Sequence, residues 1–169
     1  MSWSDARCSR RALLLGAVLL PAGCGFRLRG SAALGFQTLA LVGDGGPLRD
    51  ALRRHIEATS STRVVADPKR AQAVLTLLEV DEQQVPMAYN ADGTVAQYQL
   101  VERVRYQLTG AAGAQLIPPT TLQQTSTLSY STAAALAKDN EAQLLYAGMR
   151  EDLIERMMFQ LAAVGGRAP

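Results

Sequence analysis

The segment from residue 96 to residue 108 constrains the fold more than any other part of the sequence. Apolar and polar side chains alternate along its whole length. The apolar positions are Ala96, Tyr98, Leu100, Val104, Tyr106 and Leu108, interrupted by Glu102, and the polar positions are Gln97, Gln99, Arg103, Arg105 and Gln107, joined by Val101. This period of two predicts a long β-strand with one buried face and one polar face, which is typical of an antiparallel sheet.

Shorter patterns on either side predict the other elements. Strands are expected at 37–42, 73–80 and 122–130, and 62–66 is a short β-prone piece between the first two. Pro118-Pro119 is expected to interrupt the chain before the last strand. Apolar residues recur every three or four positions after Pro47 and again over 146–164, which predicts two amphipathic helices. Ser131 or Thr132 is the expected cap of the second helix.

The order of these elements predicts the fold class. One strand–helix–strand unit is followed by hairpin-linked strands and a long helix, so the first unit should be parallel and the remainder antiparallel. Two helices that each have one apolar stripe can cover one face of a single sheet. We therefore expect an α/β two-layer sandwich, formed as a single domain by residues 36–166, because no repeat or change of composition divides the chain.

The N-terminal segment is typical of an export signal. Three arginines precede an uncharged, mostly apolar run at 12–20, which is too short to span a bilayer. Small residues at 22–23 are followed by Cys24, a pattern similar to a bacterial lipoprotein signal, although Pro21 occupies a position where such signals prefer leucine. We expect cleavage after residue 23, acylation of Cys24, and an acylated tether over 24–35. The alternative is an ordinary secretory signal in which Cys24 has no role.

Charge and cysteine content exclude several classes of protein. Of the 17 basic and 15 acidic residues, three arginines and one aspartate lie in the signal, which leaves 14 of each in the mature chain. A neutral chain with few aromatic residues lacks the electrostatic footprint of a nucleic-acid-binding protein. Cys8 and Cys24 are the only cysteines. Cys8 would be removed with the signal and the thiol of Cys24 would be acylated, so the mature chain has no free thiol for a disulfide, a metal cluster or a nucleophile.

Motifs for catalysis, metals or cofactors are weak. The glycine-rich turn at 43–48 lacks the third glycine of a dinucleotide fingerprint, and the single histidine, His55, has no partner for a common zinc site. Glu79, Asp81 and Glu82 are best explained as a solvated strand end, and no G-x-S-x-G motif exists. We expect no enzyme, metal or cofactor. The candidate functional surface is the polar face of the 96–108 strand, which is either a docking surface or simply solvated.

Four stretches resemble the lipopolysaccharide (LPS)-assembly lipoprotein family LptE. They are CGFRLRG at 24–30, GPLR at 46–49, DG at 92–93 followed by AQYQL at 96–100, and ALAKDNE at 135–141. The first and last are the most specific, and together they span nearly the whole mature chain. The fold that the resemblance implies is two helices packed on one face of a mostly antiparallel (mixed) four-stranded sheet.

The resemblance also implies a function. It indicates an outer-membrane lipoprotein on the periplasmic face, anchored by its acyl chains, that plugs and helps assemble the LptD β-barrel at about 1:1 and takes part in delivering LPS to the outer leaflet. Because Arg and Lys are natural contacts for phosphates, Lys138, in the ALAKDNE stretch, is the first candidate for LPS binding, followed by Arg103 and Arg105. The alternative is a free-standing periplasmic ligand-binding lipoprotein that is not associated with a barrel.

Overall fold

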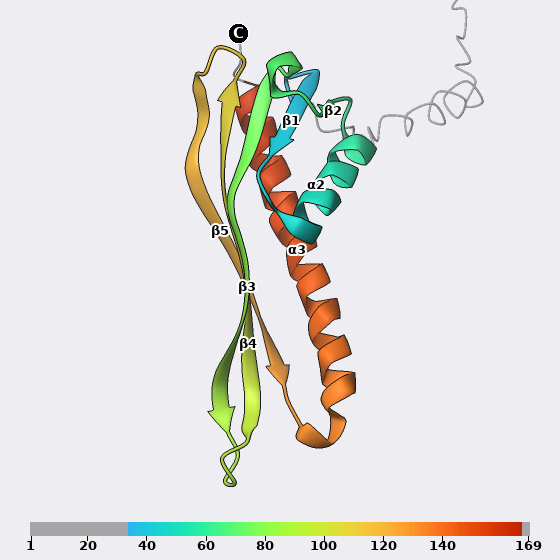
Figure 1. Ribbon diagram of the computed structural model, residues 1–169, viewed down its shortest axis with the longest axis vertical. Helices are drawn as coiled ribbons and strands as arrows, with labels where there is room; N and C mark the ends of the chain where they lie inside the picture. Colours follow the sequence, from blue (N-terminus) through green and yellow to red (C-terminus); the bar gives the residue numbers. More distant parts are fainter. Residues whose placement is uncertain (1–33, 167–169) are drawn as a thin grey trace, which may run out of the picture. The chain divides into compact units, whose positions relative to one another are not determined.

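In the computed structural model, two helices pack on one face of a five-stranded mixed sheet (Figure 1). The structure describes residues 34–166, so the expected signal peptide, most of the tether and Cys24 lie outside the described residues. The elements are β1 (Thr38–Val42), α2 (Gly46–Thr59), β2 (Arg63–Val65), β3 (Ala73–Tyr89), β4 (Val95–Gly110), β5 (Gln115–Ser129) and α3 (Ala135–Gly165), with short 3₁₀ turns at Pro68–Arg70 and Thr132–Ala134.

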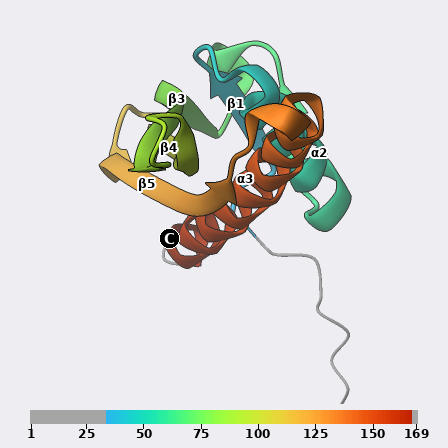
Figure 2. The same cartoon turned by 90° about the horizontal axis from the view of Figure 1, so that it is seen from below.

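The sheet has the strand order β2-β1-β3-β4-β5. β1 is parallel to both β2 and β3, whereas β3, β4 and β5 form an antiparallel meander. Both helices lie on the same side of the sheet (Figure 2). The two-layer α/β sandwich and its mixed strand directions are therefore confirmed. The sheet has five strands rather than the four that the resemblance implies, and the additional one is β2, an edge strand of three residues.

A proximal core holds α2 and the C-terminal half of α3 against the sheet. Leu48, Leu52 and Ile56 of α2 are fully buried, and so are Leu153, Met157 and Leu161 of α3. They pack on buried side chains of β1, β3 and β4, namely Leu39, Leu75, Val104, Tyr106 and Leu108. The apolar stripes read from the sequence are thus the buried faces of the two helices.

A smaller distal core lies further along the long strands, beyond the end of β1. It consists of Leu100 of β4, Leu128 of β5, and Ala142, Tyr146 and Met149 of α3. The meander and the N-terminal half of α3 form this distal half of the domain, to which α2, β1 and β2 contribute no core residue. The alternation at 96–108 therefore runs through both cores.

Two strands are longer than expected, and each of them continues through proline. β3 continues through Pro86 to Tyr89, and β5 runs through Pro118-Pro119. Register shifts in the β3–β4 pairing at Pro86 and in the β4–β5 pairing beside Pro118-Pro119 absorb these residues, as bulges on edge strands do. The expected helix cap was wrong: α3 begins after Ala134, without a capping side chain.

The chain crosses the end of α3 just before β1. Gly35 has φ of 73°, and a Cβ there would lie 2.1 Å from the carbonyl oxygen of Gly165. Both positions therefore require glycine, since a Cβ on Gly165 would lie 1.7 Å from the carbonyl oxygen of Leu34. Leu34 is only 1% exposed, so the segment expected to be a tether through residue 35 joins the core at its end.

Candidate interaction surfaces

Arg103 and Arg105 lie on the sheet face that the helices leave open. Their neighbours on β4 at 102, 104 and 106 are buried beneath α3, so these alternate residues point to the other side. Arg103 is opposite Asp81 of β3, and its guanidinium donates to the Oε1 atom of Gln123 at 3.3 and 3.2 Å. Arg105 is opposite Glu79 in the same pairing. The open face thus carries opposite charges on neighbouring strands, two arginines of β4 beside two carboxylates of β3.

Lys138 lies in a different place, close to the start of α3. Its Nζ is 2.7 Å from Oε2 of Glu141, one turn further along the helix. Arg150, on the same helix, contacts Glu102 of β4. Because Glu102 is next to Arg103, Arg150 shows which turn of α3 lies beside Arg103. Twelve residues separate Lys138 from Arg150, which is about 18 Å along the helix axis. The structure therefore does not bring the three candidate LPS contacts together, and each stays a separate prediction.

A buried charged layer separates the two cores. Glu102 of β4 is completely buried, and its Oε1 lies 3.3 Å from Nε of Arg150 on α3. Nη2 of Arg150 also lies 2.8 Å from Oε1 of Glu82 on β3. Neither carboxylate oxygen of Glu102 has a well-directed hydrogen bond from the described residues. These three side chains join β3, β4 and α3 at the boundary between the proximal and distal halves.

The environment of this layer changes two pKa values. Burial raises the pKa of Glu102 to about 7, although the positive charge of Arg150 opposes the rise and the negative charge of Glu82 adds to it. The pKa of the Tyr146 hydroxyl is also raised, mainly by burial and then by the nearby carboxylates of Glu82, Glu102 and Asp81. This hydroxyl donates to the carbonyl oxygen of Gln83 at 2.7 Å. In the sequence, Glu102 is only a break in the alternation at 96–108, and Arg150, which follows Met149 of the apolar stripe of α3, is the signal for its buried partner.

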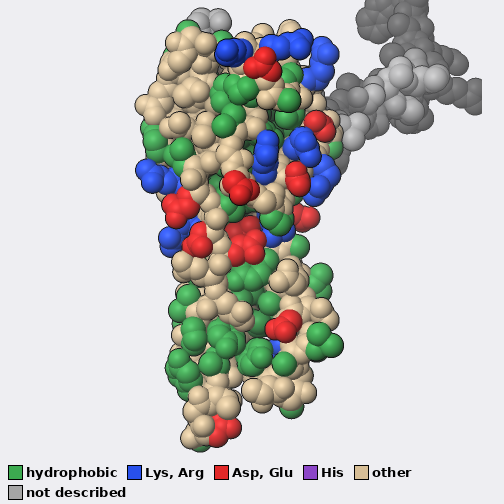
Figure 3. Space-filling model, in the orientation of Figure 1, with side chains coloured by type: hydrophobic (Ala, Val, Ile, Leu, Met, Phe, Trp, Pro, Cys, Tyr) green, Lys and Arg blue, Asp and Glu red, His purple; other side chains and the backbone are tan. Residues whose placement is uncertain are grey.

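The surface of the distal half is apolar and poor in charge. Its exposed large hydrophobic side chains are Val85, Met87 and Tyr89 of β3 and Leu136 and Leu144 of α3. The segments 83–101 and 124–149, which form this half, contain only four charged residues, Asp92, Lys138, Asp139 and Glu141. On the face drawn in Figure 3, basic and acidic side chains gather over the upper half and the lower half is mostly hydrophobic or uncharged.

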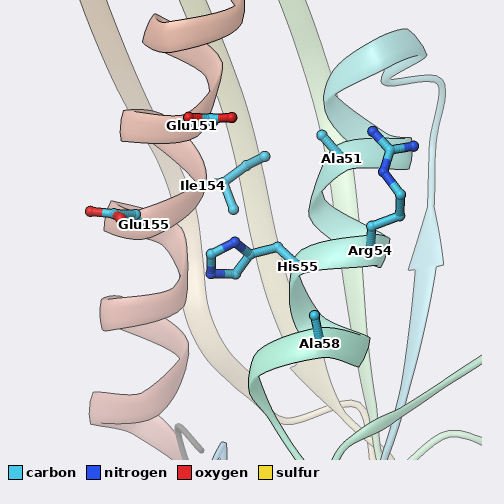
Figure 4. Close-up of a pocket in the computed structure, with 7 residues that line it drawn as sticks. All are labelled: Ala51, Arg54, His55, Ala58, Glu151, Ile154 and Glu155. Atoms are coloured by element: carbon cyan, nitrogen blue, oxygen red, sulfur yellow. The ribbon is translucent and has the colours of Figure 1, made fainter. Parts of the chain in front are cut away.

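A groove of about 410 Å³ lies between the two helices in the proximal half. Ala51, Arg54, His55 and Ala58 of α2 and Glu151, Ile154 and Glu155 of α3 line it. In Figure 4 the His55 ring lies between the helices, whereas the Arg54 guanidinium extends away from α3. Within residues 34–166 no group of three histidine or carboxylate side chains is placed to hold a metal ion. His55 itself is half-buried.

Comparison with known proteins identifies the family. A family model described as LptE, lipopolysaccharide-assembly, matches residues 33–161. The chain belongs to the LptE family. It is 34% identical over 163 residues to the LPS-assembly lipoprotein LptE of Yersinia enterocolitica, covering 90% of this chain and 75% of that protein. It is 32% identical to the protein of the same name from Pectobacterium atrosepticum, covering 91% and 85%.

Solved structures of lipoproteins share the fold. The solution structure of lipoprotein B from Nitrosomonas europaea has a TM-score of 0.71 and 26% identity, covering 82% of this chain and 91% of that one. Rare lipoprotein B from Shewanella oneidensis has a TM-score of 0.65 at 20% identity, covering 77% and 97%. No helix within the described residues is long and apolar enough to cross a membrane. Membership of the LptE family makes the chain an LPS-assembly lipoprotein of the bacterial envelope.

Proposed function

We propose that this LptE-family chain is an outer-membrane lipoprotein that plugs an LptD-type β-barrel at about 1:1 and helps it assemble. The observation that carries the proposal is the distal half, which exposes five large hydrophobic side chains and has only four charged residues. Large exposed hydrophobic side chains gathered over one half of a domain, with little charge among them, are typical of a surface that binds a partner. Depletion of charge is also the compositional mark of an interface core. A partner that encloses the distal half accounts for both.

The open sheet face suits the same partner. Interiors of large membrane barrels are polar, and β5 places Thr121, Gln123, Thr125, Thr127 and Ser129 on this face, opposite the residues of β4 that lie on it. Hydroxyl and amide groups both donate and accept, so they can satisfy hydrogen bonds against a polar wall. The balanced charges of β3 and β4 on this face add no net repulsion.

We propose that this complex takes part in delivering LPS to the outer leaflet. LPS carries phosphates, for which Arg and Lys supply charge-assisted hydrogen bonds. Lys138 in the distal half and the Arg103–Arg105 pair on the open face are two separate candidate contacts, and the half-buried Lys138, held by Glu141, remains the first choice.

The anchor of this protein is Cys24. Two or more acyl chains hold a protein stably on a membrane, whereas one gives marginal binding, so acylation of Cys24 and of the new amino terminus would keep the domain at the periplasmic face of the outer membrane. In Cys24→Ala, the lipoprotein signal peptidase should leave the precursor uncleaved. Metabolic labelling with palmitate measures the lipid, and normal cleavage or labelling of the variant would contradict this assignment.

Co-purification tests the barrel partner. The full-length chain, expressed with the LptD-type barrel of its own organism, should purify with a heat-modifiable barrel protein near 1:1. Leu144→Glu, in the distal half, should reduce the yield of the complex strongly. Phe159→Glu is the matched control, since both side chains are about three-quarters exposed on α3 but Phe159 belongs to the proximal half. A chain that purifies without a barrel would instead favour a free-standing periplasmic ligand-binding lipoprotein.

A further inference from the structure

One side of β3 has no neighbouring strand over most of its length. β1 pairs with β3 only from Ala73 to Thr76, whereas β4 pairs with β3 along its whole length. β1 ends at Val42, and at the next residue a Cβ on Gly43 would lie 2.1 Å from the carbonyl oxygen of Leu77, so the chain leaves the sheet there. Within residues 34–166, therefore, no strand covers the edge of β3 from Leu77 to Tyr89. We call this stretch the open edge.

The open edge exposes hydrogen-bonding groups of the main chain. In a strand, alternate residues direct their N–H and C=O groups to each side, so about half of those in this stretch face away from β4. Among the described residues, the one side-chain hydrogen bond to its main chain comes from the Tyr146 hydroxyl to the Gln83 carbonyl oxygen. A row of free main-chain groups is a template for pairing with another strand.

The outer part of the open edge has no charged side chain to protect it, although Pro86 and the register shift beside it lie there. Val85, Met87 and Tyr89 alternate along it and are 41%, 56% and 64% exposed. Charged side chains normally discourage pairing at an edge, yet none occurs between Gln83 and Tyr89, and Pro86 removes only one donor. The inner part is different, because Glu79, Asp81 and Glu82 are acidic.

We propose that the open edge accepts an extended segment of the barrel partner as a sixth strand of the sheet; the inference rests on the proposed function. Strand addition of this kind takes its affinity from main-chain hydrogen bonds and its specificity from alternate side chains. The segment should place apolar residues beside Val85, Met87 and Tyr89, and a basic residue beside Glu79 or Asp81. It must be a loop or a terminal segment, because strands within a closed barrel are paired on both sides.

A second copy of this chain fits the full length of the open edge, from Leu77 to Tyr89, less well. In a two-fold antiparallel pair centred on Gln83, residue numbers of opposed positions sum to 166. That register places the Asp81 carboxylate opposite Val85 and the Glu79 carboxylate opposite Met87, and the symmetry repeats each mismatch. Moving the centre toward Asp81 instead brings carboxylates of the two copies opposite each other, which is destabilising.

Amide hydrogen exchange of the full-length lipoprotein, alone and in complex with the barrel, tests the inference at the level of the main chain. Pairing should slow exchange roughly tenfold or more at alternate residues between Leu77 and Tyr89. A complex that forms near 1:1 without this protection would overturn the inference and leave the proposed function standing. Failure of any complex to form would overturn both. Protection in the absence of the barrel, with a doubled mass, would assign the edge to a second copy and overturn the inference.

Side-chain variants give a second readout. The double variant Val85→Lys and Met87→Lys places charge on the outer part of the open edge and should lower the yield of the complex about tenfold or more. Phe159→Lys, at an apolar position on α3 that is 78% exposed and belongs to the proximal half, is the control and should leave the yield unchanged. Thermal melting of each full-length variant in detergent checks folding. An unchanged yield for a folded double variant would also overturn the inference.

Discussion

The buried carboxyl of Glu102 should make the stability of this domain depend on pH, and Glu102→Gln should remove that dependence. Glu102 is completely buried, and its charged partner Arg150 approaches it at 3.3 Å without a well-directed hydrogen bond. Burial therefore outweighs the attraction of Arg150 and raises the pKa of Glu102 from its ordinary 4.5 to about 7. Glutamine keeps the size of the side chain and carries no charge at any pH.

The sign and size follow from proton linkage. Between pH 4.5 and 7 the folded domain binds more protons at Glu102 than the unfolded chain does, so the free energy of unfolding falls as pH rises. The contribution of Glu102 is fully present below about pH 4.5 and is lost as pH passes 7. A shift from 4.5 to about 7 corresponds to about 3 kcal/mol, at 1.36 kcal/mol per pH unit. This is a large part of the roughly 5–15 kcal/mol that stabilises a small domain.

Urea unfolding of the chain without its first 24 residues, at pH 4, 6 and 8, measures the effect. Wild type and Glu102→Gln should be equally stable at pH 4, and the variant should be more stable by up to about 3 kcal/mol at pH 8. Glu141→Gln is the control, because its exposed carboxyl lies far from Glu102 along α3, and it should follow the wild-type curve. If Glu102→Gln were less stable than wild type at pH 8, the attraction of Arg150 would outweigh burial and our reasoning about the layer would be wrong.

Two further predictions concern the core and the candidate LPS contacts. Leu153→Asp, at a fully buried position, should cost several kcal/mol in urea unfolding, whereas Leu144→Asp, 74% exposed, should stay within about 0.5 kcal/mol of wild type; a small effect of the first would show that the stripe is not core. Lys138→Glu and the pair Arg103→Glu with Arg105→Glu, tested separately for salt-dependent LPS binding, should each weaken it if both places contact LPS. Wild-type binding by both folded variants would refute the assignment of all three residues.

Much of the fold could be predicted because it depends on apolar periodicity. The alternation at 96–108 and the stripe ending at Leu161 locate the long strand and the long helix. Strand ends were less predictable. Pro118-Pro119 suggested an interruption, and the strand expected at 73–80 stopped short of Pro86. Both β3 and β5 nevertheless continue through these prolines, because they are edge strands along those stretches, where a missing N–H costs little. Which strand lies at an edge is a property of the assembled sheet, so sequence-local rules could not supply it.

The interaction surfaces required the assembled structure for a related reason. The sequence identified Arg103 and Arg105 as one polar face, but their separation from Lys138 depends on how far α3 runs along the strands before Arg150 meets Glu102. Likewise, Val85, Met87 and Tyr89 follow an acidic stretch and have no internal pattern that distinguishes exposure from burial. β1 is short and ends beside Leu77, so the remaining length of β3, on which they lie, has no neighbouring strand on the side away from β4. The short first strand is therefore the cause of the open edge, and any relative in which β1 extended further would cover the surface that we assign to the partner.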